Sequence, residues 1–194
     1  GPMIVCVDTS GSMKGAPEAL AKAVVLEAAR TAHREQRACH VLAFGGDLEV
    51  VAWTLDLSLK GLDSLLDFIG QAFDGGTDIA TPIDHAVALV NEHAWHDADL
   101  LIVSDGEFGA TRASLAKLDE AQAQHGLRVQ GLLIGDRETL GLLEVCDHVH
   151  WVRDWRRFDT ASAAQGGFSP VHSRSLTALY FPNALSPRAS RHRR

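Results

Sequence analysis

Short apolar runs alternate with longer helical patterns along most of this 194-residue chain, and this alternation restricts the fold more than any other feature. Such an order is typical of β-α-β units, which build a parallel sheet. The apolar runs predict strands at residues 3–7, 39–44, 48–53, 99–103, 128–133 and 148–152. The helical patterns predict helices at residues 17–36, 62–73, 82–93, 114–125 and 138–145.

The second and third predicted strands are separated by a short turn that contains Gly45 and Gly46. A turn of this length favours a hairpin, so the third strand is predicted to be antiparallel and at the sheet edge. We therefore expect an α/β, Rossmann-like, doubly wound fold. Its sheet would be mostly parallel and six-stranded, with one antiparallel edge strand and with helices on both faces.

The composition changes after about residue 159. Residues 160–175 are rich in Ala, Ser and Gly without a sustained period, residues 176–185 form a short apolar island, and the end is polar and basic. A segment of this composition lacks the apolar material for a core of its own. The expected organisation is one domain at residues 1–159 and a basic, partly disordered C-terminal tail at residues 160–194.

The charge distribution argues against a nucleic-acid partner. All 25 acidic residues precede residue 160, and five of the 18 Lys and Arg residues follow it. The acidic domain repels phosphate groups, and five arginines in the tail are a weak signal for RNA or acidic lipid. Residues 151–158 combine aromatic side chains with arginines that could stack on bases, but we expect Trp151 to pack within the last strand.

Cysteine usage and hydropathy indicate the compartment. Cys6, Cys39 and Cys146 include no CxxC pair, and an odd number of cysteines argues against a disulfide framework. We therefore expect three reduced, buried thiols. No signal-peptide pattern is visible, and no apolar run approaches the roughly 20 residues of a membrane span. A cytoplasmic protein without a transmembrane segment is expected.

Oxygen-bearing side chains gather directly after the first predicted strand, in the run Asp8-Thr9-Ser10-Gly11-Ser12. Asp8, Ser10 and Ser12 are hard oxygen donors, which suit Mg²⁺, Mn²⁺ or Ca²⁺ rather than a soft metal. One carboxylate and two neutral hydroxyls leave most of a dication's charge uncompensated, so an anion from elsewhere is expected to complete the site. The alternative is a turn and helix cap, because Ser and Asp favour both roles.

Two further segments are predicted to lie at the same edge of the sheet. Thr77 lies in a Gly-Gly loop before a helix, and Asp105 follows the fourth strand. Ligands of open parallel sheets bind beyond the carboxyl ends of the strands, where the strand order reverses. If the first and fourth strands are neighbours, Asp8 and Asp105 approach each other, and a cation between them would relieve their repulsion.

The sequence here resembles a von Willebrand factor A (VWA) domain with a metal-ion-dependent adhesion site. That site combines DxSxS after the first strand, a Thr in a later loop and an Asp after the fourth strand. All five positions match, at Asp8, Ser10, Ser12, Thr77 and Asp105. The resemblance implies a bound Mg²⁺, or Mn²⁺ or Ca²⁺. It also implies that Ser10, Ser12 and Thr77 touch the metal, whereas the two carboxylates act largely through water or hydrogen bonds.

The opening residues 1–13 and the run at residues 73–78 are most similar to the ViaA/CoxE-like group of VWA proteins. Members of this group work beside MoxR-type AAA+ ATPases. The resemblance therefore implies a non-catalytic domain for protein–protein interaction, in which a partner Glu or Asp binds the metal. A MoxR-type ATPase is the expected partner class.

Enzymatic alternatives find less support. Ser10 has no base at motif spacing, and GxSxG, GxxxxGK and post-strand GxGxxG motifs are missing from the sequence. The best enzyme alternative is a metal-dependent phosphatase or phosphotransferase that uses Asp8 as nucleophile. The pairs His93/His96 and His148/His150 could bind a metal by spacing, but each lacks a third ligand nearby in sequence, so we expect surface histidines.

Overall fold

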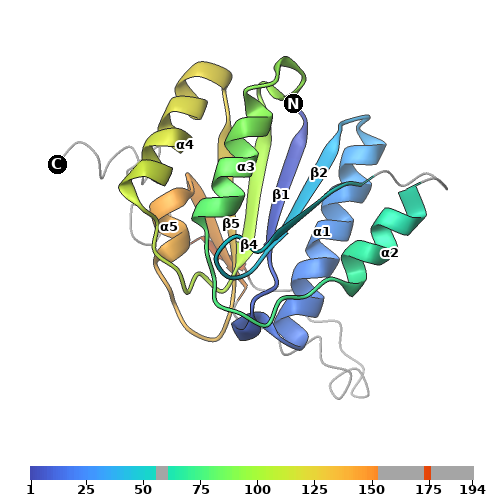
Figure 1. Ribbon diagram of the computed structural model, residues 1–194, viewed down its shortest axis with the longest axis vertical. Coiled ribbons are helices and arrows are strands. Elements are labelled where there is room, and N and C mark those ends of the chain that lie inside the picture. Colours follow the sequence, from blue (N-terminus) through green and yellow to red (C-terminus); the bar gives the residue numbers. More distant parts are fainter. Residues whose placement is uncertain (56–60, 153–172, 176–194) are drawn as a thin grey trace.

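The structure, a computed structural model, describes residues 1–55, 61–152 and 173–175. Within these ranges, strands and helices alternate as the sequence predicts, and helices cover both faces of one central sheet (Figure 1). The elements are β1 (Met3–Asp8), η1 (Gly11–Met13), α1 (Ala16–Arg34), β2 (Cys39–Phe44), β3 (Val50–Thr54), α2 (Leu62–Gly70), α3 (Ala80–Val90), η3 (His93–Trp95), β4 (Asp99–Ser104), α4 (Arg112–His125), β5 (Arg128–Ile134), α5 (Gly141–Val145), β6 (His148–Val152) and β7 (Ser173–Ser175).

The strand order across the sheet is β3-β2-β1-β4-β5-β6-β7. The pairs β1–β2, β1–β4, β4–β5 and β5–β6 are parallel, and β3 is antiparallel to β2 at one edge. The predicted Rossmann-like, mostly parallel sheet is therefore confirmed. In addition, the three-residue strand β7 pairs antiparallel with β6 at the other edge.

Strand β1 contributes to a separate core on each face of the sheet, because successive side chains of a strand point to opposite faces. Ile4 and Cys6 belong to the core under α3, α4 and α5. Val5 and Val7 belong to the core under α1 and α2. A strand buried on both faces reads as a continuous apolar run, which is what residues 3–7 show.

Other predictions for the domain interior are also confirmed. Cys6, Cys39 and Cys146 are free and buried. Trp151 is 5% exposed in the core, and its indole nitrogen donates a hydrogen bond to the carbonyl of Gly135 at 3.0 Å. Across the described ranges, no helix is long and apolar enough to cross a membrane. Most of residues 153–194 lies outside the described residues, so the predicted boundary at 159 and the predicted tail stay predictions.

The parallel strands place their carboxyl ends at one edge of the sheet, together with η1, at the bottom of Figure 1. At this edge, α5 begins against the loop that follows β4. A Cβ atom on Gly141, the first residue of α5, would lie 2.4 Å from the carbonyl oxygen of Gly106 and 2.5 Å from that of Phe108. Both distances are impossible for a real Cβ, so the close approach of α5 to this loop requires glycine.

We predict that Gly141→Ala destabilises the domain by about 1–3 kcal/mol, because the added methyl must displace the loop backbone. Gly70→Ala is the matched control, since a Cβ at Gly70 would meet nothing within 4 Å. Gly70 is the last residue of α2, where alanine has a higher helix propensity than glycine. Urea unfolding of both variants measures the difference. Equal stabilities would contradict the tight contact at Gly141.

Candidate metal centre

The five predicted site residues lie on three segments at the carboxyl edge of the sheet. Asp8 is the last residue of β1, Ser10 precedes η1, and Ser12 lies within η1. Asp105 directly follows β4, and Thr77 lies between α2 and α3. Because β1 and β4 are neighbours, with Val7 opposite Val103, the residues that follow each strand emerge side by side.

Three hydroxyl groups meet at this edge. The Oγ atoms of Ser10 and Ser12 are 3.1 Å apart, and the Oγ1 of Thr77 donates to the Oγ of Ser10 over the same distance. Two oxygens bound to Mg²⁺ at 2.0–2.1 Å and at right angles would be about 3 Å apart. The hydroxyl spacing therefore fits neighbouring positions of an octahedral Mg²⁺ site. Ser10 is buried and Ser12 is exposed, so the group opens to solvent.

The carboxylate of Asp8 lies at the base of this group, with no exposed surface. Its Oδ1 accepts a hydrogen bond from the backbone nitrogen of Ser10 at 2.9 Å. Its Oδ2 accepts one from the hydroxyl of Ser104 at 2.6 Å. The Ser104 oxygen in turn accepts from the backbone nitrogen of Gly106 at 3.0 Å, so Asp8 is connected to the loop that carries Asp105.

Burial raises the pKa of Asp8 from 3.8 to about 6. Hydrogen bonds from Ser10 and Ser104 act in the opposite direction, and the negative charge of Asp105 raises the pKa further. The effect of Asp105 on this pKa means that the two carboxylates repel each other across the site. A cation bound between them would offset this repulsion and favour the ionised form of Asp8.

Backbone contacts fix the loop that carries Thr77. The nitrogen of Gly11 donates to the carbonyl of Gly75 at 3.1 Å, and the nitrogen of Phe73 donates to the carbonyl of Thr9 at 2.9 Å. On the other side, the carboxylate of Asp78 accepts hydrogen bonds from the first backbone nitrogens of α3, at 3.0 and 3.1 Å. The Thr77 hydroxyl is therefore held between two anchored segments.

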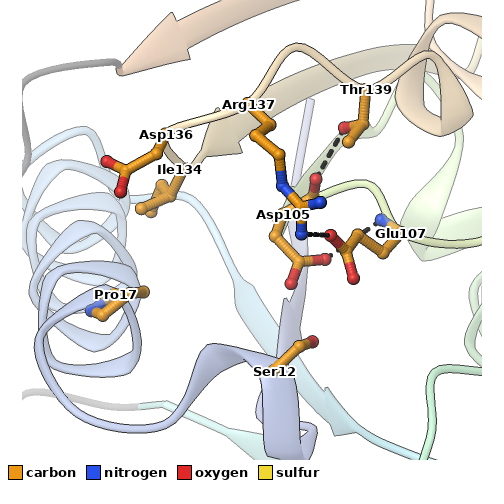
Figure 2. A pocket seen from close by; sticks show the side chains of 9 residues that line it. Ser12, Pro17, Asp105, Glu107, Ile134, Asp136, Arg137 and Thr139 are labelled. Carbon is orange, nitrogen blue, oxygen red and sulfur yellow. Dashed lines mark hydrogen bonds and ion pairs between the residues drawn. The ribbon is translucent and has the colours of Figure 1, made fainter.

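Asp105 is partly exposed and borders a hollow of about 220 Å³ (Figure 2). This hollow lies beside the three converging hydroxyls, one of which is that of Ser12. Its Oδ1 accepts a hydrogen bond from the backbone nitrogen of Glu107 at 3.0 Å. Its carbonyl accepts one from the hydroxyl of Thr139 at 2.6 Å. These contacts orient the carboxylate, and Ser12 lines the same hollow.

Sequence reasoning missed the role of Ser104, Glu107 and Arg137. Ser104 holds Asp8, and the Nη2 of Arg137 lies 2.9 Å from the Oε1 of Glu107 at the border of the hollow. The position of Ser104, directly before Asp105 at the end of the fourth predicted strand, could have predicted a contact with Asp8 at the end of the neighbouring strand. Arg137 gave no comparable signal, because it reaches Glu107 from a loop 30 positions away in sequence.

The histidine pairs have different surroundings. His148 and His150 are exposed on β6, as expected for surface residues. His93 and His96 are joined by a third ring that sequence spacing did not predict, because His125 stacks on His96 with ring centroids 4.5 Å apart. In the described part of the chain, however, no group of three or more His, Cys, Asp or Glu side chains is arranged to hold a metal. The candidate centre instead combines two carboxylates with hydroxyls.

We predict that Asp8→Asn makes the metal-free domain more stable at pH 7, by on the order of 3 kcal/mol. The raised pKa of Asp8 means that its ionisation opposes folding, whereas an amide can still accept from Ser10 and donate to Ser104. The difference should be smallest below the ordinary pKa of 3.8, where Asp8 is protonated in both states, grow between about pH 4 and pH 6, and stay constant above the folded-state pKa of about 6. Thermal unfolding in EDTA measures it, and a variant less stable than wild type at pH 7 would contradict the prediction.

Comparison with known proteins identifies the family. A family profile described as VWA domain containing CoxE-like protein matches residues 1–150. The Regulatory protein ViaA of Proteus mirabilis (strain HI4320) is 36% identical over 163 residues, which are 82% of this chain and 31% of that relative. The chain thus spans about a third of the length of this curated relative.

Solved structures agree with this assignment at the level of the fold. A von Willebrand factor type A protein from Catenulispora acidiphila aligns with a TM-score of 0.59 at 15% identity, over 85% of this chain and 41% of that chain. Proximal thread matrix protein 1 from the mussel byssus aligns with a TM-score of 0.60 at 17% identity, over 84% and 46%. The profile match over most of the chain and the identity to ViaA show that the chain belongs to the CoxE-like family of proteins with a von Willebrand factor A domain.

Proposed function

We propose that this domain binds another protein through a divalent metal, with Mg²⁺ the expected ion and Mn²⁺ or Ca²⁺ the alternatives. Membership in a family with a relative named a regulatory protein supports a role in protein interaction or regulation. The metal would be held by Asp8, Ser10, Ser12, Thr77 and Asp105, and a Glu or Asp of the partner would complete its coordination. The spacing of the three hydroxyls supports this site.

The observation that carries the proposal is that the oxygens that converge in the site are neutral, whereas the negative charge of Asp8 is already engaged by protein donors. Both oxygens of Asp8 accept hydrogen bonds from the protein, and the three converging hydroxyls are neutral. A dication held mainly by hydroxyls keeps a strong attraction for an anionic ligand. The exposed side at Ser12 and Asp105 leaves room for one, and a carboxylate is the hard oxygen anion that proteins offer.

Family membership supports a choice of partner class. The resemblance to ViaA/CoxE-like proteins leads us to propose a MoxR-type AAA+ ATPase, or a protein associated with one, as the source of the carboxylate. Such an encounter would take place in the cytoplasm, where the three free, buried thiols of this domain stay reduced.

The phosphatase alternative is less compatible with the geometry. A nucleophilic aspartate must present a free oxygen to phosphorus. Asp8 has no exposed surface, and each of its oxygens is engaged by a protein donor. The same contacts suit a carboxylate that orients the site and contributes charge.

We predict that Mg²⁺ raises the thermal stability of the wild-type domain, by about 2.7 kcal/mol when its concentration is ~100 times the Kd. Thr77→Val should weaken Mg²⁺ binding about tenfold or more, because it removes a hydroxyl at constant shape. Thr54→Val is the matched control, since Thr54 is exposed at the far end of β3. Calorimetric titration with Mg²⁺ measures the affinities, and equal affinities in the two variants would contradict the assigned site.

We further predict that a purified MoxR-type ATPase binds the immobilised domain and that Thr77→Val at least halves the captured amount at constant Mg²⁺. The variant is preferable to EDTA alone, because chelation also removes Mg²⁺ from the nucleotide of the ATPase. A capped peptide with one glutamate should bind in Mg²⁺, whereas its glutamine counterpart should not.

The outcomes separate the parts of the proposal. Peptide binding without ATPase binding would remove the ATPase and keep the metal-dependent site. Glutamate binding that is insensitive to Thr77→Val and to EDTA would overturn the site. Hydrolysis of a phosphoester that Asp8→Asn abolishes would establish the phosphatase instead.

A further inference from the structure

The hollow beside the candidate metal centre extends the surface that a ligand can contact. Ser12 lies on one side of it, Arg137 lies on the other, and Asp105 lies between them (Figure 2). The hollow measures about 220 Å³, enough for one or two side chains of a bound segment. A partner carboxylate on the metal would enter at the end formed by Ser12 and Asp105, so the neighbouring residues of the partner would pass over the rest of the hollow.

Arg137 is the one basic residue among the nine that line this hollow. Its side chain is 82% exposed, and its Nη2 pairs with the Oε1 of Glu107, which is 43% exposed. A guanidinium has five N–H donors in a planar fork that suits two-point contact with a carboxylate. The pair with Glu107 is therefore an exposed ion pair, of a kind that contributes little to stability and exchanges readily.

We propose that Arg137 is a second anchor for an acidic partner segment: it leaves Glu107 and binds a second carboxylate of the segment whose first carboxylate binds the metal. This inference rests on the proposed metal-dependent function. It specifies the ligand class as a segment with two closely spaced acidic residues. Once the first carboxylate is bound, capture of the second is intramolecular, so a contact that is weak in isolation adds to the affinity.

Glu107 has a defined part in this exchange. It competes with the incoming carboxylate for Arg137 and also repels it, because both carry negative charge. Removal of the Glu107 charge should therefore strengthen the preference for a second acid, and removal of Arg137 should abolish it. If the ion pair only stabilised the loop, the loss of either partner would change the peptide preference in the same direction. Opposite changes in Arg137→Gln and Glu107→Gln therefore identify a direct role of Arg137.

The experiment uses two capped peptides at saturating Mg²⁺. One contains two glutamates separated by one, two or three glycines, and the other has the second glutamate replaced by glutamine. Their Kd values are measured by NMR titration of the domain. We expect the wild-type domain to prefer the two-glutamate peptide at the best spacing about threefold to fivefold. Arg137→Gln should reduce this ratio to about one, and Glu107→Gln should raise it above the wild-type value.

An ion pair on α1 provides the matched control. The Nε of Arg30 lies 2.9 Å from the Oε2 of Glu27, and the two side chains are 66% and 60% exposed. Arg30 lies near the carboxyl end of α1. Helix α1 begins beside η1 at the sheet edge that carries the site and runs away from this edge (Figure 1). Arg30→Gln and Glu27→Gln change the net charge as the test variants do, but they should leave the ratio of the two Kd values unchanged, since salt screens distant charges.

The results distinguish this inference from the function on which it rests. A wild-type domain that binds both peptides equally, or a preference that survives Arg137→Gln, overturns the role of Arg137 and leaves the metal-dependent function intact. Failure of both peptides to bind in a Mg²⁺-dependent way overturns both proposals. A similar loss of preference in Arg30→Gln would assign the effect to net charge and would also overturn the second anchor.

Discussion

The parallel pairing of β1 with β4 is the constraint on which the candidate site depends. β1 pairs with β2 on one side and with β4 on the other, so the strand order reverses at this point. Loops on the two sides of such a point diverge and leave an open crevice at the carboxyl ends of the strands. The hydrogen bond from Ser104 to Asp8 spans this crevice and ties the two strand ends together. The hydroxyls of η1 and of the α2–α3 loop are then added around a carboxylate that is already fixed.

That arrangement creates an electrostatic tension that the ion pairs in the described part of the chain do not relieve. Asp8 has no exposed surface, and Asp105 adds a second negative charge near it. Of the basic residues that the structure describes at this edge, Lys14 pairs with Asp74 and Arg137 pairs with Glu107, so these two cations are directed elsewhere. Hydrogen bonds from Ser10 and Ser104 offset part of the burial cost of Asp8. The negative charge that remains unneutralised at Asp8 and Asp105 is the physical reason for proposing a divalent cation at this site.

Much of the fold could be predicted from the sequence, because the signals were local. The apolar runs of β2 and β6 match the observed strands residue for residue. β3 begins at Val50 rather than residue 48, since Leu48 adopts a positive φ of 60° in the hairpin turn. The gathering of the five oxygen-bearing residues at one edge of the sheet was predictable, because each lies beside a recognisable strand, turn or helix start. The contact between Arg137 and Glu107 depends on how two loops fold over each other, and no local pattern encodes that geometry.

The two-sided burial of β1 has a thermodynamic consequence for ligand binding. Ile4 and Cys6 pack on one side and Val5 and Val7 on the other, so the strand end that carries Asp8 has no free face on which to rearrange. The loss of conformational entropy on association would therefore fall mainly on the incoming chain. A carboxylate presented by a rigid loop loses less entropy than one on a flexible tail, so the domain would discriminate between partners by how well their acidic residues are ordered before contact.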